Sequence, residues 1–502
     1  MGLAGVDGFM VDVQTDLSQG LPGFDVVGLP GTAVRESRDR VRAALKNGGF
    51  SYPVSRITVN LAPADVRKEG SVYDLPLLIS LLLASGQLTA DLADAAIVGE
   101  LSLAGDVCAI RGVLPMVIAA RDAGLKRVFI PASNAPEGAV VDGIEVYAIP
   151  HMAVLIAHLA GAETILPARP STDITDLSYE GLDYSDVRGQ TAARRALEVA
   201  AAGGHNILLI GPPGSGKSML ARRLPTIMPD MTREEALQIT KIHSIAGTLH
   251  NAGLLKERPF RSPHHGVSPA GLAGGGSVPR PGEVSLAHNG VLFLDELPEF
   301  SHVAMECLRQ PLEDRVVTIS RVSASLTYPC SFMLVAAMNP CPCGYFGHPT
   351  RMCQCSPAAQ QNYLSRISGP LLDRIDLHVE VPPVEYEHLA LAASADNSES
   401  SAVMRERVNA ARTLQVERFN GTEIVSNAHM TPGVLREFCQ LTDTASALLR
   451  DAFDRMALSA RAYDRLLKVA RTIADLDGGG RVDVPHISEA IQYRGLDRKY
   501  WK

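Results

Sequence analysis

Residues 211–218 read Gly211-Pro-Pro-Gly-Ser-Gly-Lys-Ser218, and they directly follow the apolar run Asn206-Ile-Leu-Leu-Ile210. This is the pattern G-x-x-x-x-G-K-S, placed between an expected strand and an expected helix over residues 219–224. Glycines in such a loop let backbone N–H groups close around phosphate oxygens. Lys217 can reach the terminal phosphates, and the Ser218 hydroxyl can bind Mg²⁺. The chain is therefore predicted to bind a nucleoside triphosphate through Gly211, Pro212, Pro213, Gly214, Ser215, Gly216, Lys217 and Ser218.

Two further apolar runs end in polar residues suited to the same site. Gly290-Val-Leu-Phe-Leu-Asp-Glu-Leu297 reads as a buried strand that ends in two acids. Asp295 is expected beside the Mg²⁺ ion, and Glu296 is expected to polarise the attacking water. The run over residues 332–338 ends at Asn339, whose amide would orient that water between the carboxylates and the γ-phosphate.

Two arginines complete the expected catalytic set. Arg374 lies at a helix end before a strand, and Arg461 begins a helix over residues 461–470. A guanidinium fork fits phosphate oxygens at the transition state, and a fork supplied by a neighbouring subunit couples hydrolysis to assembly. Either arginine alone is better explained as a surface salt-bridge residue, but their combination with the loop favours a catalytic role.

Composition sets the broad class of the protein. A chain of 502 residues is too long for one core and predicts roughly two to four domains. Its longest apolar stretch, residues 75–84, is far shorter than the ~20 residues that cross a bilayer, so a core helix is expected there. No secretory signal is visible, which favours a cytoplasmic protein without a membrane partner. A net charge of −8 does not exclude nucleic-acid binding, because local basic loops are sufficient for it.

Hydrophobic periodicity divides the chain into three parts. Residues 1–161 are a mixed α/β block, with strands expected at 57–61, 127–131 and 144–148 and helices at 33–46 and 113–123. A linker over 162–180 leads to a second α/β block over 181–392. A small, polar stretch begins at 393, and residues up to 502 then read as helical, ending in a helix near 485–493.

Four of the eight cysteines lie close together as Cys341, Cys343, Cys353 and Cys355. Four thiolates in the spacing C-x-C-x₉-C-x-C can surround one Zn²⁺ ion tetrahedrally, with His348 as a substitute ligand. The alternative is a set of surface thiols in a reducing compartment. A metal here would brace the insert 341–355 after Asn339 and would be structural, not catalytic.

These motifs together resemble the AAA+ ATPases of the magnesium-chelatase branch, and the likeness to the ComM/YifB family covers nearly the whole chain. Specific stretches are Phe24-Asp-Val-Val-Gly-Leu-Pro30, Asn60-Leu-Ala-Pro-Ala-Asp65, Phe260-Arg-Ser-Pro-His-His265 and Arg280-Pro-Gly-Glu-Val-Ser-Leu-Ala-His288. The resemblance implies that Asn339 is sensor 1, Arg374 the trans-acting finger and Arg461 sensor 2. Family members usually carry a longer segment before Gly5, so a first strand is expected to be missing.

The same resemblance implies a homohexameric ring that hydrolyses ATP with Mg²⁺ and acts as a DNA helicase in branch migration. The partners it implies are single-stranded or branched DNA and recombination proteins. Residues 258–277 match the helix-2 insert of this branch, and residues 315–328 match its presensor-1 hairpin, with Arg321 near the turn. An ordinary active-site loop and an edge hairpin are the alternatives. Arg35, Arg38 and Arg42 share a helix face that is more simply a solvated one.

Residues 98–107 and 110–120 resemble the Lon protease domain. That chemistry needs a serine nucleophile and a lysine base, but the matching positions hold Val72 and Leu114. The predicted fold is therefore α/β, with a degenerate Lon-protease-like N-terminal domain, a P-loop AAA+ core and an all-helical C-terminal lid. Two rival functions are a chelatase-like or chaperone-like remodeller of a protein partner and, less favoured, a nucleotide-dependent protease.

Overall fold

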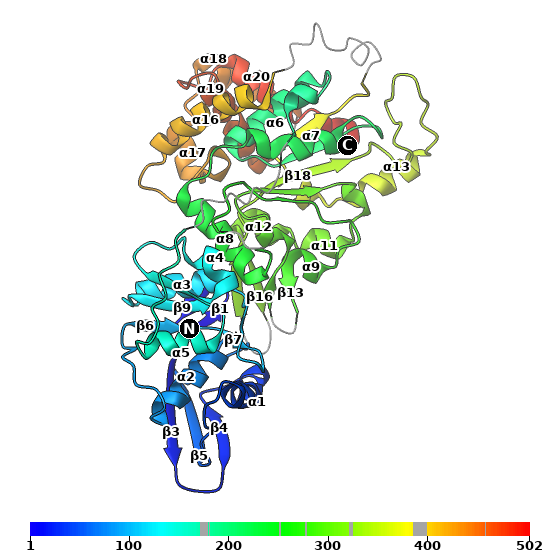
Figure 1. Cartoon of the computed structure of the whole chain (residues 1–502). Coiled ribbons are helices and arrows are strands. Elements are labelled where there is room, and N and C mark those ends of the chain that lie inside the picture. The colour runs from blue at the N-terminus through cyan, green and yellow to red at the C-terminus, as the bar shows by residue number, and fades with distance from the viewer. Residues whose placement is uncertain are drawn as a thin grey trace. The chain divides into compact units, whose positions relative to one another are not determined.

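The computed structural model describes residues 1–170, 179, 181–249, 253–276, 279–320, 325–384, 399–456 and 458–501. Contacts between residues divide the chain into two compact units, drawn in Figure 1. Unit 1 contains Met1–Asp176, Arg233–Lys256 and Ser320–Tyr328, and unit 2 contains Leu177–Thr232, Glu257–Ile319 and Pro329–Lys502. Residues 233–256 follow the phosphate-binding motif in sequence, yet they pack within unit 1.

Unit 1 is built on two three-stranded sheets. In one sheet β5 (Arg56–Ala62) lies between β3 (Asp12–Ser18), which is antiparallel to it, and β4 (Gly23–Val27), which is parallel. The other sheet is parallel, in the order β10 (Glu145–Ile149), β9 (Arg127–Pro131), β6 (Ala95–Ile97). The remaining elements of unit 1 are β1 (Gly2–Ala4), β2 (Asp7–Phe9), β7 (Glu100–Leu101), β8 (Val107–Cys108), a 3₁₀ turn (Ala132–Asn134), α1 (Thr32–Asn47), α2 (Asp74–Ala84), α3 (Val113–Asp122), α4 (Ala135–Gly138), α5 (Met152–Leu159) and α8 (Arg233–Ala246).

The helices of unit 1 follow the polarity of their sequences. In α1 the buried side chains include Val34, Val41 and Leu45, which repeat at helical spacing and face the core. Arg35, Arg38 and Arg42 are exposed on the same helix, which confirms the prediction of a solvated charged face. The apolar helix α2 is buried along nearly its whole length, as expected for residues 75–84.

Unit 2 contains a five-stranded parallel sheet in the order β12 (Phe260–Arg261), β15 (Val291–Leu294), β18 (Met333–Met338), β11 (Ile207–Ile210), β19 (Leu377–Glu380). Helices cover both faces of a parallel sheet, so its strands are continuous apolar runs. β11, β15 and β18 are buried at every residue. Because all neighbouring strands run the same way, their carboxyl ends meet at one edge of the sheet.

The elements of unit 2 around this sheet are short, apart from α6 (Thr191–Gly203). They are α7 (Lys217–Arg223), α9 (Pro269–Ala273), β13 (Gly274–Gly275), β14 (Arg280–Pro281), α10 (Glu283–Leu286), α11 (His302–Glu306), α12 (Arg309–Asp314), α13 (Pro357–Leu364), α14 (Gly369–Leu372) and four 3₁₀ turns (Tyr184–Asp186, Leu224–Ile227, Leu297–Glu299, Asn427–His429). The predicted hairpin is present as β16 (Val316–Ser320) and β17 (Ser325–Pro329), of which β17 belongs to unit 1 except for its last residue. Arg321, expected near its turn, lies outside the described residues.

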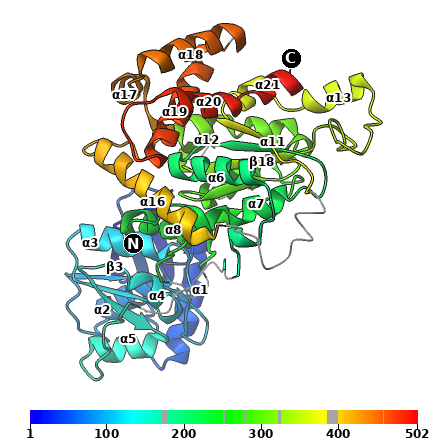
Figure 2. The same ribbon diagram turned by 90° about the horizontal axis from the view of Figure 1, so that it is seen from above.

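The C-terminal part of unit 2 is helical, as predicted, and no strand occurs in the described portion of residues 399–501. Its helices are α16 (Ser401–Arg418), α17 (Pro432–Phe438), α18 (Asp443–Met456), α19 (Ala460–Leu476), α20 (Val484–Gln492) and α21 (Leu496–Tyr500). Figure 2 shows α16, α19 and α20 grouped together, and both α16 and α19 contact α6.

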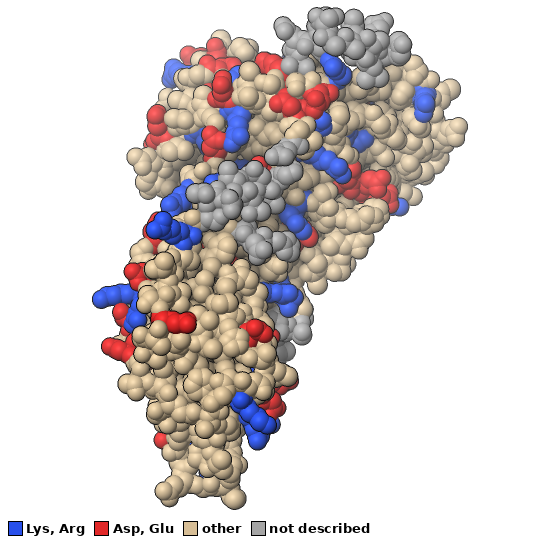
Figure 3. All heavy atoms as spheres, viewed as in Figure 1, with Lys and Arg blue, Asp and Glu red and all other residues tan. Residues whose placement is uncertain are grey.

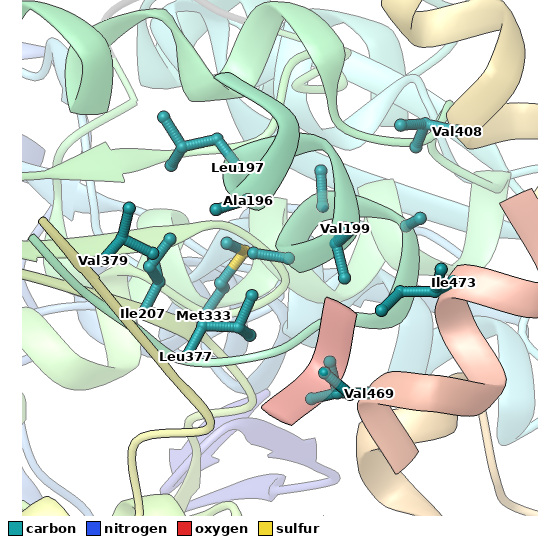
Figure 4. Packing of buried hydrophobic residues seen from close by; sticks show 14 of the residues in the cluster. Ala196, Leu197, Val199, Ile207, Met333, Leu377, Val379, Val408, Val469 and Ile473 are labelled. Atoms are coloured by element: carbon teal, nitrogen blue, oxygen red, sulfur yellow. The ribbon is translucent and has the colours of Figure 1, made fainter. Parts of the chain in front are cut away.

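One apolar core joins these helices to the sheet (Figure 4). Leu197 and Val199 from α6 pack with Ile207 from β11 and with Val469 and Ile473 from α19. All five side chains are at most 2% exposed, so α6, α19 and the sheet share a continuous buried interface. None of the helices that the structure describes combines the length and the apolar character needed to cross a bilayer.

Candidate active site

The carboxyl ends of β11, β15 and β18 surround a cavity of about 350 Å³. It is lined by Pro213, Gly214, Ser215, Gly216, Lys217, Ser218, Met219, Asp295, Glu296, Met338 and Asn339. The structure therefore brings the predicted phosphate loop, the two acids and Asn339 to one place. Gly211 and Pro212, the first two residues of the loop, are not among the lining residues. Their carbonyl oxygens accept hydrogen bonds from Lys217.

The loop conformation explains its glycines. Gly214 and Gly216 have φ angles of 77° and 90°, in the left-handed region that residues with a Cβ rarely adopt. A Cβ on Gly211 would lie 2.2 Å from the carbonyl oxygen of Val381, so no larger residue fits there. Gly216 is also the N-cap of α7, which makes the helix begin at Lys217 and not, as expected, at Met219. Free backbone N–H groups at this end suit an anion.

Lys217 is the buried cation of the cavity. Its Nζ donates to the carbonyl oxygens of Gly211 at 2.7 Å and Pro212 at 2.9 Å, and to Oδ1 of Asn339 at 3.3 Å. Burial lowers the pKa of Lys217 to about 8, against the opposing effect of the nearby carboxylates of Asp295 and Glu296. Phosphate oxygens brought into the cavity would favour the charged ammonium.

The arrangement of Ser218 and Asp295 fits a magnesium ion. The Ser218 hydroxyl donates to Oδ2 of Asp295 at 2.6 Å, so a hydroxyl and a carboxylate, both oxygen donors, already face each other. The other oxygen of Asp295 accepts from the backbone N–H of Glu296 at 3.0 Å. This bond fixes the direction of the Asp295 carboxylate toward the phosphate loop.

Glu296 follows β15 with a left-handed backbone, φ 53°. Its side chain is 56% exposed, and its Oε2 lies 3.4 Å from Nδ1 of His265. Our sequence reasoning did not name His265 as a site residue. No local pattern indicated it, because the residues that follow β12 and β15 reach the same sheet edge only through the parallel pairing of these two strands.

The two predicted arginines lie elsewhere. Neither Arg374 nor Arg461 is among the residues that line the cavity. Arg374 donates from Nη1 to the carbonyl oxygen of Pro370 at 2.7 Å and from Nη2 to the carboxylate of Glu313. This hydrogen bond, and to a smaller extent the charge of Arg461, lowers the pKa of the Glu313 carboxyl. Both arginines thus gather near Glu313, and Arg461 is exposed.

The sulfur atoms of Cys341, Cys343, Cys353 and Cys355 all lie within 4.8 Å of one another. Three of the pairs are separated by 3.4–3.6 Å. Zn–S bonds of about 2.3 Å in a tetrahedron require sulfurs ~3.8 Å apart, so the four cysteines fit zinc. His348 is not part of this cluster, because its Nδ1 accepts from the backbone N–H groups of Thr350 and Arg351.

The cysteine insert also contacts the phosphate loop. Gly344 has a φ of 83°, and a Cβ on it would lie 2.4 Å from Cδ of Pro213. Cys341 is buried only two residues after Asn339. A metal that binds the four sulfurs would thereby help to fix Pro213 and Asn339, which both line the cavity.

We expect the purified protein to carry one zinc ion per chain, measured by elemental analysis. A Cys343→Ser and Cys355→Ser double variant should lose the zinc and bind ATP about 10-fold more weakly, because small displacements of positioned groups are costly. ATP binding is measured by calorimetry. Cys307→Ser, which changes a half-buried cysteine outside the cluster, is the control and should keep both properties. A zinc-free variant with unchanged ATP affinity would contradict the link.

In unit 1 the positions matched to the Lon nucleophile and base are filled by apolar side chains. Val72 and Leu114 are 8% and 0% exposed and belong to the core. The nearby Ser71 hydroxyl donates to the carboxylate of Glu100, and Lys68 donates to the carbonyl oxygen of Pro63. Both polar side chains therefore have structural partners.

The expected DNA-facing segment 258–277 is only partly a free loop. Arg258 donates to the carbonyl oxygens of Pro229 and Asn289, and Arg261 pairs with Glu283 at 2.7 Å. Both arginines lie at the start of the segment, and they hold that end in place. On the face drawn in Figure 3, lysines and arginines are scattered among acidic residues, in agreement with the modest net charge.

Comparisons with known proteins agree with this geometry. Residues 183–389 match the family described as "Magnesium chelatase, subunit ChlI", and residues 13–134 and 398–494 match two further families of the same subunit. The chain is 44% identical to the uncharacterized protein YifB of Escherichia coli and 44% identical to the competence protein ComM of Haemophilus influenzae. Each comparison covers 98% of this chain and 96% of the relative.

Two more distant likenesses are shorter. A 200-residue stretch is 28% identical to the Lon protease of Mycolicibacterium smegmatis and covers 38% of this chain and 23% of that protein. A 163-residue stretch is 29% identical to the magnesium-chelatase 67 kDa subunit of Chlorobaculum parvum, covering 31% of this chain and 23% of that subunit.

Proposed function

The chain belongs to the magnesium-chelatase-like AAA+ ATPases of the ComM/YifB family, and from this premise we propose that it is an ATP-driven ring motor acting on DNA. In this proposal it is a helicase that promotes branch migration in recombination or natural transformation. The observation that carries the ATPase part is the single cavity shared by Lys217, Asp295, Glu296 and Asn339.

Each residue of the cavity has a separate role in hydrolysis. The loop N–H groups and Lys217 bind the phosphates of ATP, and Ser218 with Asp295 would hold Mg²⁺, which screens the phosphate charge. Glu296 accepts the proton of the attacking water, and Asn339 orients that water by its amide. Since Lys217 already bonds Asn339 at 3.3 Å, both side chains are in reach of the same phosphate.

Arg374 and Arg461 support the ring part of the proposal. They lie together near Glu313 and away from the cavity of their own chain. In a homohexameric ring they serve the ATP bound by the adjoining copy, where they stabilise the charge of the transition state. Hydrolysis then requires assembly.

The DNA part is supported by the printed name of the Haemophilus influenzae relative, a competence protein. It is tested by one ATPase titration with single-stranded, duplex and forked DNA. We expect stimulation by single-stranded or forked DNA, and strand displacement that Glu296→Gln abolishes while ATP binding persists. A turnover rate that no DNA changes would refute the DNA part and leave the ATPase part intact.

The likeness to a magnesium-chelatase subunit favours a second candidate, an ATPase that remodels a protein partner. This candidate predicts an ATP-dependent complex with a protein client, recovered with Glu296→Gln as a trap, and no response to DNA. The same titration therefore separates the two functions.

A further inference from the structure

Asn206, the residue immediately before β11, binds the segment that carries Arg374. Its Nδ2 donates to the carbonyl oxygen of Arg374 at 2.9 Å. Its own carbonyl oxygen accepts from the backbone N–H groups of Asp376 at 2.9 Å and Leu377 at 3.1 Å. One residue therefore holds the turn between α14 and β19 by its side chain and by its main chain.

The other polar atom of the Asn206 side chain is bound to the parallel sheet. Its Oδ1 accepts from the backbone N–H of Leu334 in β18 at 2.8 Å. Only this orientation of the amide fits, because a backbone N–H group faces one of its atoms and a carbonyl oxygen faces the other. The next residue, Ile207, pairs with Val335 of β18 and with Leu377 of β19. The amide thus connects the backbone of Arg374 to the sheet.

The rest of the turn is held independently of the Asn206 amide. Oδ2 of Asp376 accepts from the backbone N–H of Asn206 at 3.2 Å and lies 3.3 Å from Nδ1 of His205. His205 in turn contacts Oγ1 of Thr472 in α19 through its Nε2 at 2.8 Å. These bonds use the main chain of Asn206 or other side chains, so they would survive truncation of the amide. Such a truncation would release the carbonyl group of Arg374 and leave the sheet intact.

The backbone of Arg374 needs such support. It follows α14, a helix of only four residues, and a helix of one turn is not stable without contacts to its surroundings. An arginine reaches its target through several rotatable bonds, and its planar fork fits phosphate oxygens only in a narrow range of positions. A small displacement of the main chain at Arg374 would therefore be enough to misplace the guanidinium.

We propose that Asn206 is the positioning residue of the arginine finger, and that its amide fixes the peptide of Arg374 so that the guanidinium meets the ATP bound by the adjoining copy. This inference rests on the proposed ring motor. Asn206 is not among the residues that line the cavity of its own chain, and it lies at the other end of β11 from the phosphate loop. Its effect is therefore exerted on the turnover of the neighbouring copy.

The first test is Asn206→Ala in the full-length assembled protein. Its kcat should fall about 10- to 50-fold, because misplacing a catalytic group by ~1 Å costs up to ~10²-fold. The affinity for ATP, measured by calorimetry, should stay unchanged, because the phosphate loop is not altered. Asn420→Ala, which changes an exposed asparagine of unit 2, is the control and should behave as the wild type. An Asn206→Ala variant with wild-type kcat would overturn the proposal.

Asn206→Asp separates the two bonds of the amide. The variant keeps an acceptor for the N–H group of Leu334, but it places a carboxylate oxygen against the carbonyl oxygen of Arg374. Because neither oxygen can donate, kcat should fall at least as far as in Asn206→Ala. If Asn206→Asp turned over at the wild-type rate, the bond to the sheet would be the important one, and the positioning of Arg374 would be refuted.

Mixed rings show on which copy Asn206 acts. In rings of Asn206→Ala and Lys217→Ala subunits, the well-positioned Arg374 of a Lys217→Ala subunit serves the intact cavity of an Asn206→Ala neighbour. Turnover should therefore exceed that of Asn206→Ala alone. Rings of Asn206→Ala and Arg374→Ala subunits should stay at or below that rate, since neither subunit supplies a positioned finger. Recovery in the second mixture and none in the first would mean that Asn206 acts on its own cavity, contrary to the proposal.

A control mixture keeps this result separate from the proposed function. Rings of Lys217→Ala and Arg374→Ala subunits should regain activity whatever the role of Asn206. If they do not, the finger acting between copies fails, and the Asn206→Ala and Arg374→Ala double variant decides alone. A double variant no slower than Arg374→Ala supports the positioning of Arg374 by Asn206, whereas a further loss as large as that of Asn206→Ala would show independent action and overturn it.

Discussion

Lys217→Ala is expected to lower kcat/KM for ATP hydrolysis by about 10²–10³-fold, the loss that follows removal of one preorganised donor to developing charge. Lys217 is 8% exposed and is the one cation among the residues that line the cavity. Its ammonium would exchange the carbonyl oxygens of Gly211 and Pro212 for phosphate oxygens. Removing it leaves the phosphate charge without a buried partner. Phosphate release under saturating ATP measures the loss.

The controls address charge and folding. Lys217→Arg keeps the charge but places a planar fork where the cavity holds a compact ammonium, so most activity should still be lost. Lys256→Ala changes an exposed lysine and should hydrolyse ATP normally. If Lys217→Ala retained even a tenth of the wild-type turnover, the assignment of this cavity as the ATP site would be wrong.

Arg374→Ala is expected to reduce kcat by about 10³-fold while ATP binding remains, because arginine fingers contribute 10³–10⁵-fold to turnover. The structure places Arg374 with Glu313, outside the cavity of its own chain. The loss should therefore appear in kcat and not in the affinity for ATP measured by calorimetry. Glu313→Ala removes the same ion pair but leaves Arg374. This variant therefore distinguishes the catalytic effect of the Arg374 guanidinium from the effect of losing a local ion pair on stability.

Mixing two inactive variants decides whether Arg374 acts on its neighbour. A site formed by Lys217 of an Arg374→Ala subunit and Arg374 of a Lys217→Ala subunit contains both groups. Mixed rings should regain part of the ATPase activity that neither variant shows alone. Mixtures that remain inactive after confirmed co-assembly into rings would argue that Arg374 acts within its own chain.

The phosphate loop and its acids could be predicted from the sequence because each is a local pattern at the end of an apolar strand. Parallel pairing of β11, β15 and β18 then brings these ends together without further information. The C-terminal helices were predictable for a similar reason, since α19 buries Leu466, Val469, Ala470 and Ile473 at helical spacing.

Contacts between distant segments could not be predicted in this way. Glu313 and Arg374 are 61 residues apart, and no local pattern joins them. His265 meets Glu296 only because β12 lies beside β15, a neighbour relation that periodicity does not encode. Likewise, the amphipathic pattern of α8 would fit the core of either unit, so the sequence did not show that α8 belongs to unit 1.

The membership of α8 limits how the polypeptide can be dissected. The backbone passes between the units at 176/177, 232/233, 256/257, 319/320 and 328/329. Leu237 and Leu254 pack against the apolar interior of unit 1, where α8 meets α3. Removing the residues before the 162–180 connection would take away the core of unit 1 against which both leucines pack, and would expose them to water. Segments of the two units therefore alternate along the sequence. Neither unit can be replaced, as one continuous segment, by the corresponding domain of an unrelated ATPase.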